Sequence, residues 1–131
     1  MQLAKTKISF VIPVYMAEFI LEKLVIEIDK VMLVIGEAYE VVLVDDRSSD
    51  NSWEVIEKLS TINSNVKGVR LSKNFGQHPA ILAGLSQAEG EWIVVLDCDL
   101  QDQPKEVEKL YHKAVEGFDI VLAKRTQRKD N

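Results

Sequence analysis

The stretch Trp92-Ile-Val-Val-Leu-Asp-Cys-Asp99 joins an apolar run directly to two carboxylates. A short, continuous apolar run rich in β-branched residues is typical of a strand that is buried on both faces of a sheet. Earlier in the chain, the runs at Ile8–Val14 and Glu40–Val44 have the same character, and polar residues follow each of them. The sequence therefore predicts buried strands whose ends carry the functional groups.

Segments with helical periodicity separate the apolar runs. Apolar residues recur at helical spacing between Leu21 and Ile35, and Gly36 is placed to end that helix. The other expected helices begin at Ser49 or Asp50, at Pro79 and at Pro104, and the last two stop near Gly90 and Gly117. The expected strands are Ile8–Val14, Glu40–Val44, Val66–Leu71, Trp92–Leu96 and Ile120–Ala123. This alternation predicts an α/β fold, a doubly wound and mainly parallel sheet with helices on both faces.

The carboxyl ends of the predicted strands point to one ligand site. In a doubly wound sheet the ligand lies outside these ends, near the point where the strand order reverses. The polar residues that follow the strands are Tyr15, Asp45–Asp46, Lys73–Asn74 and Asp97–Asp99. We therefore expect them to converge on one edge of the sheet.

Composition excludes several classes of protein. The 131 residues carry a net charge of −5, which argues against a nucleic-acid binder because little would neutralise a phosphate backbone. The single cysteine, Cys98, excludes an internal disulfide and a cysteine-rich zinc site. The longest apolar stretch, Phe19–Ile35, contains five charged residues, so we expect no membrane span in this chain.

The acidic loop after the fourth predicted strand is the strongest candidate for a metal site. Asp97 and Asp99 repel each other unless a cation lies between them, and Mg²⁺ typically takes one or two carboxylates together with substrate phosphates. Gln101 and Asp102 add oxygens within the same turn. The alternative is a solvated loop whose carboxylates lie near the N-terminus of the next helix, where the helix dipole favours them.

A second acidic group, Asp45 and Asp46, ends the second predicted strand. An aspartate at this edge can accept a hydrogen bond from a base imide or from a ribose hydroxyl, and the alternative is an ion pair with Arg47 or Lys73. Asp50 or Ser49 is interpreted as a helix cap. Lys73 is a candidate for contact with a phosphate or with an acidic partner.

Taken in order, these segments resemble the family 2 glycosyltransferases, inverting enzymes of GT-A fold. The likeness extends from Ile8 to about Asp130. It rests on Val11-Ile-Pro-Val-Tyr15, Val41-Val-Leu-Val-Asp-Asp-Arg-Ser-Ser-Asp50, Leu71-Ser-Lys-Asn-Phe-Gly-Gln-His78, Ala83-Gly-Leu-Ser-Gln-Ala-Glu-Gly90 and Val95-Leu-Asp-Cys-Asp-Leu-Gln-Asp-Gln-Pro104. The third and fifth of these stretches resemble more specifically the branch that transfers sugars to polyisoprenyl phosphates, such as dolichyl or undecaprenyl phosphate.

The resemblance implies a site and a reaction. Residues Pro13, Tyr15 and Glu18 would line the base and ribose pocket, and an aspartate of the pair Asp45–Asp46 would contact the base or ribose. Asp97, Asp99 and Gln101 would hold a divalent cation, Mg²⁺ or Mn²⁺, with the diphosphate of a nucleotide-sugar, a UDP-sugar being favoured. Arg125 would meet the acceptor phosphate, so the catalytic set would be Asp97, Asp99 and Arg125. Two departures bear on the loops: Met16 stands where the family usually has asparagine, and Arg47 replaces a common glycine.

The resemblance also bears on the whole protein. Residues 1–131 would be the nucleotide-sugar-binding part of a GT-A catalytic domain that is truncated at its C-terminus. The full-length protein would be bacterial, would act in cell-wall or surface polysaccharide synthesis, and would work at the cytoplasmic face of the membrane, with or without its own membrane anchor. Two alternatives stay open: a nucleotide-binding module without catalysis, and a receiver-type signalling domain, in which the acidic pair would follow the first strand.

Overall fold

The computed structural model describes residues 5–99 and 104–117. Its elements are β1 (Ile8–Val14), α1 (Leu21–Ile35), β2 (Tyr39–Asp45), α2 (Ser52–Ile62), β3 (Val66–Arg70), α3 (Gln77–Gln87), β4 (Trp92–Val95), a 3-10 turn η1 (Pro104–Glu106) and α4 (Val107–Val115). Strands and helices alternate in the predicted order. The expected fifth strand, Ile120–Ala123, lies outside the described residues.

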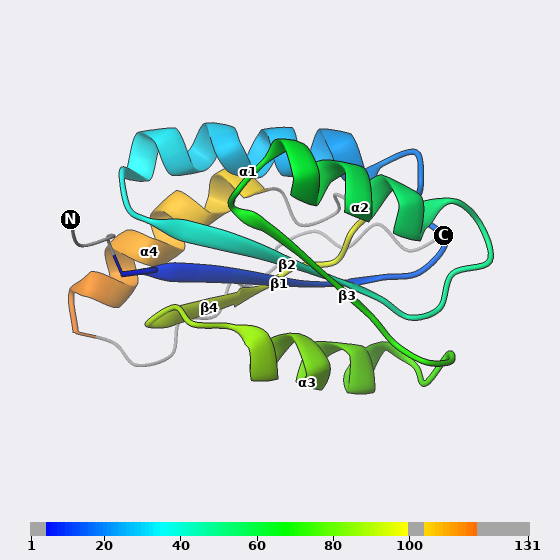
Figure 1. Cartoon of the computed structure of the whole chain (residues 1–131). Helices are drawn as coiled ribbons and strands as arrows, with labels where there is room; N and C mark the ends of the chain where they lie inside the picture. Colours follow the sequence, from blue (N-terminus) through cyan, green and yellow to red (C-terminus); the bar gives the residue numbers. More distant parts are fainter. Residues whose placement is uncertain (1–4, 100–103, 118–131) are drawn as a thin grey trace, which may run out of the picture.

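The described strands form one parallel sheet in the order β3-β2-β1-β4. Ile8 of β1 lies opposite Tyr39 of β2 on one side and opposite Trp92 of β4 on the other. The chain moves outward from β1 through β2 to β3, and then crosses back to place β4 on the other side of β1 (Figure 1). The strand order therefore reverses between β1 and β4, the point at which such sheets bind ligands.

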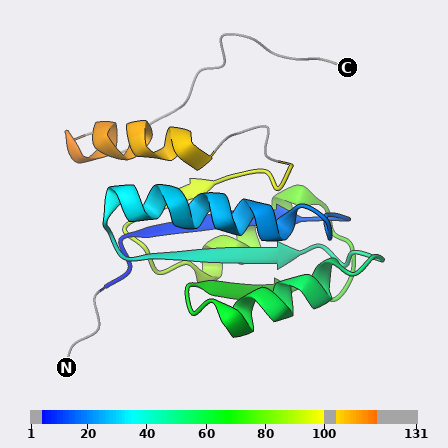
Figure 2. The ribbon, with the colours of Figure 1, turned by 90° about the horizontal axis from the view of Figure 1, so that it is seen from above.

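Helices cover both faces of this sheet, as predicted. Helices α1, α2 and α4 lie on one face and α3 lies on the other (Figures 1 and 2). The larger core fills the space under α1, where Phe10, Leu24 and Ile28 are fully buried. On the opposite face, Ala80 of α3 packs against Val42 and Val44. All seven residues of β1 are buried, as its continuous apolar run indicated. The expectation of a strand buried on both faces is wrong for β4, because Ile93 and Val95 on one of its faces are exposed.

Two helix boundaries differ from the expectation. Helix α3 begins at Gln77, so Pro79 lies within its first turn, where a missing N–H breaks no helical hydrogen bond. The helix ends at Gln87, ahead of Gly90. Gly90 serves a different purpose, because a β-carbon there would lie 2.6 Å from Ser9 Oγ. Its small size allows the loop before β4 to approach β1.

No described helix combines the length and apolar character needed to span a membrane.

Candidate functional site

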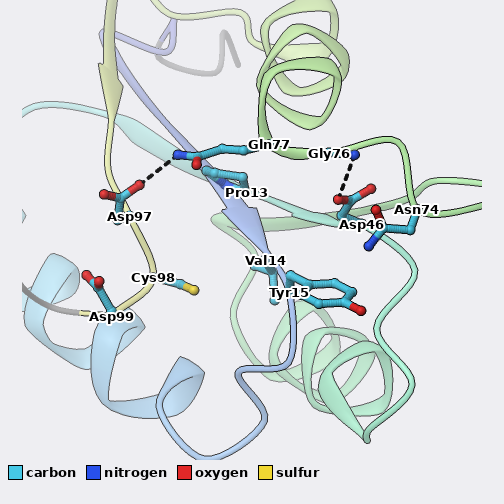
Figure 3. Close-up of a pocket in the computed structure, with 10 residues that line it drawn as sticks. All are labelled: Pro13, Val14, Tyr15, Asp46, Asn74, Gly76, Gln77, Asp97, Cys98 and Asp99. Carbon is cyan, nitrogen blue, oxygen red and sulfur yellow. Dashed lines mark hydrogen bonds between the residues drawn. The ribbon is translucent and has the colours of Figure 1, made fainter.

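A cleft of about 590 Å³ lies at the point where the strand order reverses. It is lined by Pro13, Val14, Tyr15, Asp46, Asn74, Gly76, Gln77, Asp97, Cys98 and Asp99 (Figure 3). These residues come from the carboxyl ends of β1, β2 and β4 and from the loop that leads into α3. The predicted convergence of the strand ends is confirmed, and the volume suits a small-molecule ligand.

The cleft opens where pairing between β1 and β4 stops. The last paired residues are Val11 and Val95, and the final hydrogen bond runs from Leu96 N–H to the Val11 carbonyl at 3.2 Å. Residues of a strand alternate in the direction of their backbone groups, so Pro13 faces the same side as Val11. Proline has no N–H to donate, and it is tolerated here because, among the described residues, the pairing with β4 on that side has already ended at Val95.

The loop after β1 is held by a set of side chains from the segment that precedes and begins α2. Three successive backbone N–H groups, those of Met16, Ala17 and Glu18, donate respectively to Ser48 Oγ at 2.9 Å, Ser52 Oγ at 2.8 Å and Asp50 Oδ2 at 3.3 Å. Because this loop carries Tyr15 into the cleft, the serines and Asp50 determine where the Tyr15 ring lies. Asp50 also accepts from Ser52 N–H at 3.0 Å, but the cap residue of α2 is Asn51, so the expected cap position was too early in the chain.

Met16 and Arg47 have positive φ angles of 54° and 59°. This left-handed region is accessible to glycine and, among other residues, most readily to asparagine and aspartate. The two positions are those where the sequence departs from the asparagine and the glycine of the family it resembles. The loops therefore keep the backbone shape that those residues would favour, and Ser49 Oγ contacts Met16 Sδ at 3.3 Å to join the two loops.

The carboxylates of Asp45 and Asp46 have different surroundings. Asp45 is completely buried, accepts from Ser48 N–H at 3.2 Å and forms an ion pair with Arg70 at 3.4 Å. Asp46 faces the cleft, and its two oxygens accept from the N–H groups of Phe75 and Gly76 at 2.8 and 3.0 Å (Figure 3). The partner of the pair is thus Arg70, where the sequence had suggested Arg47 or Lys73, and Asp46 fixes the loop ahead of α3.

The acidic loop lies across the cleft from Asp46. Asp97 is half-buried and Asp99 is exposed, and both line the cleft. Gln77 Nε2 donates to Asp97 Oδ1 at 3.0 Å. Burial, reinforced by the charges of Asp99 and Asp97, raises the pKa of the Cys98 thiol. A neutral thiol is a poor nucleophile, so these surroundings disfavour a covalent role for Cys98.

The cleft gathers some of the predicted site residues. Pro13, Tyr15, Asp46, Asp97 and Asp99 line it, whereas Glu18, Asp45 and Lys73 do not belong to its described wall. The Lys73 ammonium lies over the Phe75 ring, 5.2 Å from its centre. Gln101 and Arg125 lie outside the described residues.

Asn74, which the sequence placed among the residues expected at this edge, lines the cleft, whereas Gln77 was missed. The signal for Gln77 was the polar stretch between a strand and a helix, which only the topology brings beside Asp97.

The described donors suit a hard divalent cation. Among the described residues, no group of three or more histidine, cysteine, aspartate or glutamate side chains could hold a metal ion by itself. Two cleft carboxylates separated by one residue nevertheless match the usual contribution of a protein to a Mg²⁺ site in which substrate phosphates supply other ligands. The described carboxylates therefore suit a cation that binds together with a phosphorylated ligand.

The family model described as Glycosyl transferase family 2 matches residues 9–131. The chain belongs to glycosyl transferase family 2. The receiver-type alternative is removed by this membership. A relative from Proteus mirabilis, undecaprenyl-phosphate 4-deoxy-4-formamido-L-arabinose transferase, is 43% identical over 95% of this chain and 39% of its own length. The protein of the same name from Yersinia pestis (strain Pestoides F) is 41% identical, over 95% of this chain and 38% of its own length.

Two solved structures share the fold of this chain. Staphylococcus aureus TarS 1–349 in complex with UDP-GlcNAc is 30% identical with a TM-score of 0.67, covering 85% of this chain and 31% of TarS. The mannosyltransferase PcManGT from Pyrobaculum calidifontis, in complex with GDP-Man and Mn²⁺, has a TM-score of 0.60 at 22% identity, over 72% of this chain and 28% of its own. The architecture is thus the GT-A fold. The chain spans about two fifths of the length of the curated relatives that it matches.

Proposed function

We propose that residues 1–131 are the nucleotide-sugar-binding part of a GT-A glycosyltransferase that passes a sugar to a polyisoprenyl phosphate. One observation carries the proposal: a cleft at the strand-order reversal has Tyr15 and Asp46 on one side and Asp97 and Asp99 on the other. A nucleoside needs a ring surface and hydrogen-bond acceptors, and a diphosphate needs counter-charge. Tyr15 and Asp46 supply the ring surface and an acceptor for the nucleoside, and a cation at Asp97 and Asp99 would supply the counter-charge for the diphosphate.

Different residues would contact the nucleoside and the diphosphate of the donor. Tyr15 packs against the base or ribose, and Pro13 leaves the strand edge open for it. An aspartate of the pair Asp45–Asp46 accepts from the base or ribose, with Asp46 at the wall of the cleft. Asp97 and Asp99, with Gln101 from the adjoining segment, hold Mg²⁺ or Mn²⁺. When bound, the cation neutralises the charge that develops on the departing nucleoside diphosphate.

The acceptor part of the proposal rests on the relatives, whose names specify undecaprenyl phosphate. A phosphate oxygen attacks the anomeric carbon as the bond from that carbon to the diphosphate breaks, and the configuration inverts. A phosphate is already anionic, so it needs little help from a general base. Arg125 would meet the acceptor phosphate. A lipid acceptor of this kind places the full-length protein at the cytoplasmic face of the membrane.

Calorimetry of UDP, GDP and TDP binding, with and without Mn²⁺, tests the donor site. We expect UDP to bind best and Mn²⁺ to strengthen its binding. Asp99→Ala should remove most of this strengthening. Glu57→Ala, which removes an exposed carboxylate from α2, is the matched control and should behave as the unaltered chain. Nucleotide binding that ignores Mn²⁺ and is unchanged by Asp99→Ala would refute the acidic loop's role.

A nucleotide-binding module without catalysis is the second candidate, because the described cleft residues that carry the proposal account for binding of the donor. Incubation with a labelled UDP-sugar and a short-chain polyisoprenyl phosphate distinguishes the two. Labelled lipid indicates a transferase, whereas Mn²⁺-dependent binding without turnover indicates a binding module.

A further inference from the structure

Gln77 connects the two sides of the cleft. It is the first residue of α3, and its Nε2 donates to Asp97 Oδ1, 3.0 Å away, at the end of β4 (Figure 3). The side-chain amide can donate from its nitrogen, whereas a carboxylate can only accept. The amide nitrogen of Gln77 must therefore face Asp97, and this hydrogen bond fixes the direction in which the Asp97 carboxylate points.

The backbone that carries Gln77 is itself fixed. Immediately before it, the N–H groups of Phe75 and Gly76 donate to the Asp46 carboxylate, and Gly76 has a φ of 106° that glycine adopts without strain. Further along α3, Gly84 lies so close to the sheet that a β-carbon there would be 2.5 Å from Val11 Cγ1. Helix α3 is thus held in place at its start and at Gly84, and this position allows Gln77 to reach Asp97.

We propose that Gln77 is a positioning residue that sets the orientation of Asp97 for the cation and diphosphate. The inference rests on the proposed function, because it assigns a supporting role within the same site. Asp97 and Asp99 lie on a turn that leaves a strand. A carboxylate that is already oriented needs less ordering when the cation and diphosphate arrive. Hydrogen-bond partners behind a metal ligand act in this way, and their removal typically weakens metal affinity by about 10–100-fold.

Calorimetry of UDP binding to the full chain, with and without Mn²⁺, tests the role. The measured quantity is the factor by which Mn²⁺ strengthens UDP binding. Gln77→Leu keeps the size of the side chain but removes the donor, and we expect the factor to fall about tenfold. The melting temperature should stay the same, and UDP affinity without Mn²⁺ should change less than UDP affinity with Mn²⁺. Gln87→Leu is the control, because Gln87 is exposed at the far end of the same helix and should leave all three quantities unchanged.

A second variant guards against misfolding of the first. Gln77→Met likewise keeps the approximate size of the side chain but removes the N–H donor, and its Mn²⁺ factor should also fall while the melting temperature holds. An unchanged factor in either variant overturns the proposal. Equal losses with and without Mn²⁺, accompanied by a lower melting temperature, overturn it as well, because they indicate a purely structural role. Failure of Mn²⁺ to affect UDP binding in the unaltered chain removes the proposed function along with the inference.

Discussion

Met16 places an L-residue with a flexible side chain in a left-handed conformation at φ 54°. This conformation brings the β-carbon close to the following carbonyl oxygen and costs roughly 1–2 kcal/mol for an ordinary residue. The loop tolerates the cost because its N–H groups are held from the α2 side, including that of Met16 by Ser48. The strain is therefore local, and a substitution can relieve it.

We expect Met16→Asn to raise the free energy of unfolding by roughly 0.5–1 kcal/mol, since asparagine adopts this conformation more readily. Chemical denaturation measures the change. Met16→Ala is the control: it removes the same contact with Ser49 but keeps the preference against left-handed φ, so it should bring no gain. A stability of Met16→Asn equal to that of Met16→Ala would show that the backbone conformation contributes nothing.

Asp50 holds the loop after β1, a role that the sequence could not distinguish from that of a helix cap. An aspartate before a helix is a good cap, and that interpretation fitted the local pattern. The carboxylate also accepts from Glu18 N–H, 32 residues away in the chain. Only the packing of the loop after β1 against α2 creates this contact. Hydrogen bonds with Ser52 and with the Glu18 N–H outweigh the effect of burial and lower the pKa of Asp50.

Asp50→Ala should therefore loosen the Tyr15 loop as well as the start of α2. We expect UDP binding without Mn²⁺ to weaken, because we propose that Tyr15 contacts the nucleoside, while the factor contributed by Mn²⁺ stays the same. Calorimetry under both conditions separates the two effects. Asn51→Ala is the comparison, since Asn51 adjoins the same helix but makes no side-chain cap bond with it. Equal UDP affinities in the two variants would contradict the role of Asp50.

Among the helices and strands, the sequence predicted the order of the elements but missed the start of α3 and how closely α3 approaches the sheet. The continuous apolar runs identified β1 and β2 because both strands are buried on the two faces of the sheet. The start of α3 was misplaced, because Pro79 is a strong local signal while the true start depends on Asp46 holding the preceding N–H groups. Gly84 carried no signal of its own, although its lack of a side chain decides how closely α3 approaches the sheet.

Gly84→Ala tests that approach. Alanine favours a helix by about 1 kcal/mol over glycine, but the added β-carbon would lie 2.5 Å from Val11 Cγ1 and 3.0 Å from Val44 Cγ2. Overpacking of this kind typically costs about 1–3 kcal/mol, so we expect a net loss in the free energy of unfolding. Ser86→Ala, at an exposed position of the same helix, should be close to neutral. A gain in stability for Gly84→Ala would mean that α3 moves away from the sheet at little cost.

At the scale of the molecule, the two ends of the sheet serve different purposes. The carboxyl ends of the strands hold the cleft, while the amino ends are joined by the buried Glu40 of β2. Glu40 Oε2 accepts from Ser9 Oγ of β1 and from Glu89 N–H before β4, both at 2.6 Å. Its Oε1 meets Lys67 Nζ of β3 at 2.7 Å, as an ion pair rather than a well-aligned hydrogen bond. One carboxylate thus connects β1, β2, β3 and the loop before β4 at the end remote from the cleft.

Glu40 should make the stability of the fold depend on pH. Burial alone would raise its pKa, but the Lys67 ammonium, Ser9 and the Glu89 N–H outweigh burial and hold the pKa below its ordinary value of 4.5. Because the folded state favours the charged form, this stabilisation is present above the ordinary pKa and is lost as the pH falls through the lower, folded value.

We expect Glu40→Gln to lower the free energy of unfolding at pH 7 by about 2 kcal/mol, the usual contribution of hydrogen bonds to a charged group. Urea denaturation across a pH series should show the difference from the unaltered chain shrinking below about pH 4.5. Glu89→Gln removes an exposed carboxylate 3.8 Å from the same Lys67 and should have little effect at any pH. A Glu40→Gln deficit that stays constant down to pH 3 would show that shape, and not charge, accounts for the role of Glu40.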